Sequence, residues 1–260
     1  MATLNLTAPT SWNSLSQEQL EFLLRTIATV NRANTNKPFK SFEDFSAQVA
    51  AQVATYCLFK WNGLTVITPY GDDWLILHDG HELCVKGEDI AAATSALAWI
   101  NDLPDTPVQL ETINGAKAVD PELDDSFSFD DWLSCEALWQ GYQVVKSEQF
   151  LQQMAEVLYR KPGIKLQDHQ ILSIFYWWAG LKNLCNRLYP NFFRPSAPDS
   201  GVEPDRDMIR RNMDSQIRAL TKGDITKEEK ILSMPAHRAL TELEALAKEY
   251  EELNRKYPSK

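Results

Sequence analysis

The feature that most constrains this chain is an apolar, aromatic run at residues 170–193, QILSIFYWWAGLKNLCNRLYPNFF, in which residues 175–178 are four adjacent aromatics. A surface this apolar must be covered by lipid, by the core of the protein or by a partner chain. A membrane span needs about 18–20 apolar residues, whereas Asp168 and Lys182 bound a much shorter stretch. The run therefore predicts a helix that packs on protein, not one that crosses a bilayer.

On a helix at 168–189, most apolar residues of the run fall on one stripe and the others on a second stripe beside it. Two interpretations stay open: the helix is the centre of a C-terminal bundle, which we favour, or part of it is a docking face for a helical partner. Aromatic side chains dominate such docking faces. The candidate partner-binding residues are Trp132, Trp139, Phe175, Tyr176, Trp177, Trp178, Phe192 and Phe193.

Charge argues against one class of partner. The formal net charge is −10 and the pI is about 5.0, whereas nucleic-acid binding depends on clustered lysine and arginine. The excess of negative charge is concentrated at 102–136, where ten acidic residues face a single lysine. We therefore expect no nucleic-acid partner and a solvated acidic segment in the middle of the chain.

The pattern of turns and apolar periodicity predicts a mainly α fold with a small antiparallel β-hairpin region, an α+β arrangement whose C-terminal half is helical. Four parts are expected. They are an N-terminal α+β part at 1–101, an acidic linker at 102–127, an aromatic-rich helical bundle at 128–195 and C-terminal helices at 204–260.

Local signals place the elements of the N-terminal part. Ser16 and Gln19 have the spacing of a reciprocal capping box, which predicts a helix from there to about Val30. A second, alanine-rich helix is expected from Phe42 to about Thr55. Asn-Gly at 62–63 and Asp-Gly at 79–80 are strong hairpin signals, and they predict four short strands between residues 56 and 86.

Three helices are expected in the tail. Gly223 is typical of a residue that ends a helix, and Thr226 with Glu229 has capping-box spacing. The last helix carries an a/d seam, with apolar residues at alternating spacings of three and four, that covers fewer than three heptads. We favour packing of this helix on its own domain, and the alternative is oligomerisation through Leu243, Leu246, Tyr250, Leu253 and Tyr257.

Two patterns suggest a metal but fit poorly. If Asp79-Gly80 is a two-residue turn, His78 and His81 face each other, while strand alternation sends Cys84 to the opposite face. The acidic run at 120–131 resembles a calcium loop, but it has aspartate where the loop requires glycine. We expect neither a metal nor another cofactor.

Catalytic motifs are also missing, because the sequence has no nucleophile elbow, no phosphate-binding glycine loop and no zinc-protease motif. We therefore expect a protein that is not an enzyme, and the less favoured alternative is an enzyme whose site residues are too scattered for a single sequence to reveal. The four widely spaced cysteines are typical of reduced cytosolic thiols, and MATLNLTAPTSWNS lacks the pattern of a secretory leader. These observations favour a cytoplasmic location.

Two stretches resemble proteins of phage and prophage tail-gene modules, particularly of Bacteroidales. One is PTSWNSLSQEQLEFLL, and the other is FSFDDWLSCEALW together with LQQMAEVLYRKPG. The resemblance implies a tail assembly chaperone-like protein, which shields an apolar tape measure protein, or another tail protein, in the bacterial cytoplasm. The alternative that it leaves open is a minor structural protein of the virion that self-associates through its C-terminal helices.

Overall fold

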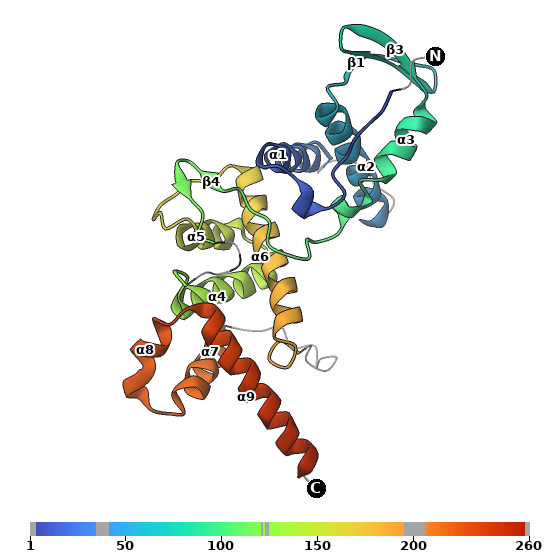
Figure 1. The fold of residues 1–260 in the computed structure, drawn as a ribbon. Coiled ribbons are helices and arrows are strands. Elements are labelled where there is room, and N and C mark those ends of the chain that lie inside the picture. The colour runs from blue at the N-terminus through green and yellow to red at the C-terminus, as the bar shows by residue number, and fades with distance from the viewer. Residues whose placement is uncertain (1–3, 35–41, 121, 123–124, 195–205, 258–260) are drawn as a thin grey trace. The chain divides into compact units, whose positions relative to one another are not determined.

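The computed structural model describes residues 4–34, 42–120, 122, 125–194 and 206–257. These residues form two compact units (Figure 1). Unit 1 contains the described residues up to Pro104 together with Asp168–Ser173, and unit 2 contains Asp105–Gln167 and the described residues from Ile174 onward. Helices predominate in both, and the strands form only two small antiparallel sheets, which confirms the predicted mainly α fold with a helical C-terminal half.

Unit 1 is a group of helices with one three-stranded sheet. Helix α1 packs on α2, and α2 in turn packs on α3 and η2. Its elements in chain order are η1 (Trp12–Ser14), α1 (Gln17–Asn34), α2 (Phe42–Trp61), β1 (Thr65–Tyr70), β2 (Asp73–His78), β3 (His81–Val85), α3 (Gly87–Ser95) and η2 (Ala98–Asn101).

Helix α1 begins where the capping box predicts. The backbone N–H of Ser16 donates to Gln19 Oε1 at 2.9 Å, and the N–H of Gln19 donates to Ser16 Oγ at 3.2 Å. Two otherwise unpaired amides of the first turn are thereby satisfied. The apolar face that follows, which includes Leu23 and Leu24, is buried.

The prediction of a hairpin at Asn62-Gly63 is wrong, because α2 continues past Thr55 to Trp61. Gly63 has a φ of +64° and ends the helix in a left-handed conformation, with the N–H of Leu64 donating back to the carbonyl of Phe59 at 2.9 Å. The sheet therefore has three strands rather than four. An Asn-Gly pair can therefore end a helix as well as form a hairpin turn, because glycine adopts a positive φ without strain.

The three strands pair in the order β1-β2-β3. Asp79 and Gly80 both have positive φ, as a two-residue hairpin turn requires, and His78 pairs directly with His81. This turn and the facing histidines confirm the predicted second hairpin. The core side of the sheet centres on Ile76, which is fully buried.

Unit 2 is built around α4, which packs on α5, α7, α8 and α9. Its elements in chain order are β4 (Thr112–Ile113), β5 (Ala116–Lys117), α4 (Phe129–Val145), α5 (Glu148–Leu158), α6 (Asp168–Leu188, of which the first turn belongs to unit 1), α7 (Arg206–Thr221), η3 (Ile225–Lys227), α8 (Glu228–Leu232) and α9 (Ala236–Lys256).

The acidic segment is structured where a solvated linker was expected. Val108, Leu110 and Ile113 are buried, and the chain turns back at Asn114-Gly115 to form the β4–β5 hairpin. The Tyr159 hydroxyl from the end of α5 donates to the carbonyl of Leu110 at 2.5 Å. Carboxylates of this segment such as Asp105, Glu111 and Asp120 are exposed, while its apolar side chains contribute to the core of unit 2. Three residues of the acidic run that was compared with a calcium loop, at 121, 123 and 124, lie outside the described residues.

The tail contains the three expected helices, with one different cap. Gly223, at a φ of +80°, follows α7 and donates its N–H to the carbonyl of Arg218 at 3.2 Å, as predicted for a helix end. The next turn is capped by Asp224, whose Oδ1 accepts from the N–H and hydroxyl of Thr226. The predicted capping box of Thr226 with Glu229 is thus wrong, because the N–H of Thr226 donates to the carboxylate of Asp224 instead of that of Glu229.

Candidate functional site

Three of the predicted docking residues form the interior of unit 2. Trp177 and Trp178 have relative exposures of 0% and Trp132 of 1%. The rings of Trp132 and Trp178 lie 5.2 Å apart, and that of Trp177 lies 5.9 Å from Tyr159 of the preceding helix. These contacts place the centre of the aromatic run in the core, as the favoured interpretation expected, and they leave these three side chains no surface to offer a partner.

The other five docking candidates are half-buried. Trp139 and Phe175 stack with ring centroids 5.5 Å apart, and Phe175 also contacts Tyr176 at 5.4 Å. Phe192 contacts Phe193 at 4.8 Å, and Phe193 meets Trp132 edge-on. Burial raises the pKa of Tyr176 to about 12, so its hydroxyl stays protonated at neutral pH. Each of these rings already packs on a neighbouring ring.

Beside this cluster lies a polar pair that the sequence analysis did not single out. Lys182 Nζ donates to Glu136 Oε1 at 2.9 Å, and the same oxygen accepts from Gln140 at 3.1 Å. The ammonium lies 4.6 Å from the centroid of Phe193 and 5.6 Å from that of Trp132. Such a pair is stable when charge, hydrogen bonds and aromatic faces together replace water.

The pair lines an open pocket of about 560 Å³ between α4, α6 and α7. Amide side chains such as Asn186 and Gln216 line the remainder. One carboxylate oxygen of Glu136 accepts from Lys182, and the other is inaccessible to solvent. The arrangement is therefore a structural ion pair, since a ligand could not reach the carboxylate without displacing Lys182.

The buried cysteines carry no evident chemistry. Burial raises the pKa of Cys57 and of Cys185 to about 12, and burial with the neighbouring Asp131 and Glu136 charges raises that of Cys135 well above its usual value. These thiols stay protonated at neutral pH and are poor nucleophiles. Cys84 is exposed on β3.

A metal centre finds no support in the described part of the chain, where no group of three or more histidine, cysteine, aspartate or glutamate side chains is placed to hold an ion. His78 and His81 face each other across their hairpin, but Cys84 pairs with Leu75 further along the strand. None of the helices among the described residues combines the length and hydropathy that a bilayer-spanning helix needs.

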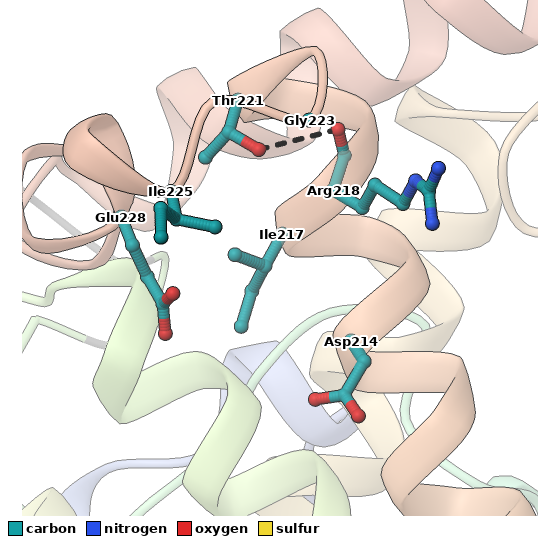
Figure 2. Close-up of a pocket in the computed structure, with 7 residues that line it drawn as sticks. All are labelled: Asp214, Ile217, Arg218, Thr221, Gly223, Ile225 and Glu228. Carbon is teal, nitrogen blue, oxygen red and sulfur yellow. Dashed lines mark hydrogen bonds between the residues drawn. The ribbon is translucent and has the colours of Figure 1, made fainter.

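A second pocket, of about 370 Å³, lies between α7 and the η3–α8 turn (Figure 2). Ile217 and Ile225 point toward each other at its centre, and Ile225 is 81% exposed. Asp214 and Glu228 lie at its edge, and the hydroxyl of Thr221 donates to a backbone carbonyl of its own helix end. This lining combines small apolar contacts with carboxylates and selects no particular ligand.

Among the described residues, the clearest apolar surface without a packing partner is on α9. The seam predicted from the sequence is divided in the structure. Its first part is internal, because Ala239 and Leu243 are buried where α9 packs on α4 and α7. Its second part is exposed, with relative exposures of 67% for Tyr250, 56% for Leu253 and 76% for Tyr257. We call Leu246, Tyr250, Leu253 and Tyr257 the α9 stripe. Leu243 is therefore corrected from an oligomerisation residue to a core residue.

The C-terminal half of α9 contacts the segment at 191–194 through the helix face opposite the stripe. Glu244 accepts hydrogen bonds from the backbone N–H groups of Asn191 and Phe192, both at 2.9 Å, and Glu251 forms an ion pair with Arg194. Both glutamates project away from the stripe, because at about 100° per residue they lie well over 90° around the helix from its centre. The stripe is thus on the exposed face of a helix whose opposite face contacts its own unit.

Unit 1 has an exposed apolar surface that the sequence analysis missed. Every residue of β1 is exposed, including Ile67 and Tyr70. Strand β1 is an edge strand, and it contains Pro69 and an irregular register with β2 between Val66 and Thr68. Such features prevent the addition of another strand. The signal was available in the sequence, because proline within an apolar run marks an edge strand.

Comparison of this chain with models of known protein families, with curated protein sequences and with solved structures finds no match in any of the three.

Proposed function

We propose that this chain is a non-catalytic morphogenesis factor of a phage or prophage tail module, of the tail assembly chaperone type, that binds an apolar helical partner chain. The observation that carries the proposal is the α9 stripe. It consists of four apolar side chains on one helix face, three of them more than half exposed. Tyrosine and leucine at this spacing suit a helix that packs against a helix.

The geometry of the stripe supports binding rather than chance exposure. Single exposed apolar residues are ordinary on protein surfaces, but a continuous row is typical of an interaction site. The row continues the buried face of the same helix, so the part of α9 that carries it is anchored at its start by Leu240 and Leu243. A pre-ordered face loses little conformational entropy when a partner binds.

The tail-module part of the proposal comes from the two stretches that resemble such proteins, and the structure gives them structural roles. Trp12 of the first stretch is buried and donates its indole N–H to the carbonyl of Asp102 at 2.8 Å. In the second, Ser128 and Asp131 cap α4, and Arg160 binds Asp131. Both stretches therefore have structural roles in this chain, which is compatible with the non-catalytic factor that we propose.

The test is co-purification of the full chain with the products of its neighbouring genes, followed by mass spectrometry. We expect capture of a long helical chain, and we expect Tyr250→Ala combined with Leu253→Ala to weaken its binding at least tenfold, because tyrosine is enriched among binding hot spots and the second change removes the apolar side chain beside it on the stripe. Tyr56→Ala is the matched control, since Tyr56 is also an exposed helical tyrosine, 58% exposed, but lies in unit 1. The proposal fails if the α9 variant, shown to be folded by circular dichroism, captures the same chain as strongly as the control.

A minor structural virion protein is the second candidate, because the same stripe would also suit self-association within a particle. Analysis of purified particles separates the two candidates. A chaperone is expected to be missing from them, whereas a structural subunit is expected at a fixed copy number.

A further inference from the structure

We propose that a second copy of this chain covers the α9 stripe when no other partner is bound, and that the two α9 helices pair in antiparallel orientation. The inference rests on the proposed function in that the same four residues form the docking face. It goes further by naming an occupant and an orientation, which follow from the order of large, small and charged residues along the helix.

The order of side-chain sizes favours the antiparallel arrangement. A two-fold axis between Tyr250 and Leu253 puts Tyr250 opposite Leu253 of the second copy. Leu246 lies four residues before Tyr250, and Tyr257 lies four residues after Leu253, so the same register puts Leu246 opposite Tyr257. Every layer then combines one tyrosine with one leucine, and no residue of the stripe stays uncovered. A parallel pair would place tyrosine against tyrosine and leucine against leucine.

The charges beside the stripe point to the same orientation. Glu249 and Lys256 are both exposed, and each directly precedes a stripe residue, Tyr250 or Tyr257, on the same side of the helix. In the antiparallel register Glu249 lies within reach of Lys256 of the second copy, and the two-fold axis repeats the pair. In a parallel pair the nearest cross-helix neighbour of Glu249 is Asn254, which offers no opposite charge.

Among the described residues that flank the stripe, no charge opposes this pairing. Ala247 and Asn254 occupy the other flank of the stripe and are uncharged. Glu244 and Glu251 are held at the back of α9 by the segment at 191–194. The two copies therefore meet through an apolar seam with one attractive pair at each side.

The test is sedimentation equilibrium of the full chain over a range of concentrations, with a reductant present because Cys84 is exposed. We expect a reversible dimer. Glu249→Lys and Lys256→Glu should each weaken it about tenfold, because each turns two attractive pairs into two repulsive ones. An equimolar mixture of these two variants should form a heterodimer within about twofold of the wild-type affinity, since both cross-helix pairs are then attractive again.

The matched control is Lys248→Glu, an equal change of charge on the face of α9 away from the stripe, which should leave the dimer unchanged. A wild-type chain that stays monomeric at every concentration refutes the second copy as occupant. A dimer that ignores the charge variants, or that the mixture does not restore, refutes the antiparallel register. In either case, partner capture by the wild-type chain and its loss in the Tyr250→Ala, Leu253→Ala variant still decide the proposed function separately.

Discussion

Replacing Gly180 by alanine tests whether the acidic segment packs on α6 through its backbone. Gly180 is buried in the interior of α6. A methyl group added there would lie 2.8 Å from the carbonyl carbon of Thr106 and 3.1 Å from the nitrogen of Pro107, and closer still to the Thr106 carbonyl oxygen. Because these atoms belong to the main chain, they cannot move aside by rotating a side chain.

Two effects of opposite sign determine the size of the change. Alanine in place of glycine in a helix interior stabilises the helix by about 1 kcal/mol. Forcing extra volume into a packed site costs about 1–3 kcal/mol, and a clash with backbone belongs at the upper end of that range. We therefore expect Gly180→Ala to lower the unfolding free energy of unit 2 by about 2 kcal/mol.

The measurement is native-state hydrogen exchange of amides in α4 and α6, which reports the opening free energy of unit 2 itself. Gly141→Ala is the control, because the three atoms nearest to a methyl group there, the closest at 2.6 Å, all belong to the ring of Phe150, a side chain that can rotate away. We expect this control to change stability by less than about 1 kcal/mol. If Gly180→Ala stabilised unit 2 as the helix effect alone predicts, the close approach of Thr106 to α6 would be refuted.

Three further predictions concern other parts of the structure. Trp177→Ala should destabilise unit 2 by about 3–5 kcal/mol in urea unfolding, and clearly more than the same change at the half-buried Phe175, because it leaves a large cavity. Burial and the nearby Arg25 lower the pKa of His169, which is 4% exposed. Because the unfolded chain then binds a proton at His169 more readily than the folded chain, unit 1 should lose stability as the pH falls below about 6.5. Thermal unfolding at several pH values should show this loss, and His169→Gln should reduce it. Burial alone would raise the pKa of Asp131, but hydrogen bonds from Arg160 and Ser128 outweigh it and lower the pKa. Asp131→Asn should therefore cost about 1–3 kcal/mol at pH 7, and urea unfolding at lower pH should show the difference shrinking as the wild-type carboxyl protonates below pH 4.

Signals that depend on neighbouring residues alone predicted the structure well. The Ser16–Gln19 capping box, the turn at Asp79-Gly80 and the helix end at Gly223 all occur where the sequence places them. Each is decided by hydrogen bonds or φ angles within a few residues, so the rest of the fold has little influence on it.

Errors arose where one local signal serves two structures. Asn-Gly at 62–63 ends a helix, whereas Asn114-Gly115, with φ angles of 49° and 77°, forms the β4–β5 hairpin inside the segment predicted to be a linker. The distinction lies in the flanking residues. Cys57 and Leu58 continue the helical spacing of the buried face of α2, while Ile113 anchors a short strand in the core of unit 2.

The candidate site shows why periodicity alone could not locate it. Trp177 and Tyr250 both belong to regular apolar faces, yet one is fully buried and the other is 67% exposed. What separates them is which elements cover each face, because Trp177 packs against Tyr159 at the end of α5, whereas α9 packs on α4 and α7 and becomes exposed toward its C-terminal end. That boundary is a property of the assembled fold. The pairing that we propose depends on this boundary, because it leaves the four residues of the stripe for a second helix and places the charges at 249 and 256 beside them.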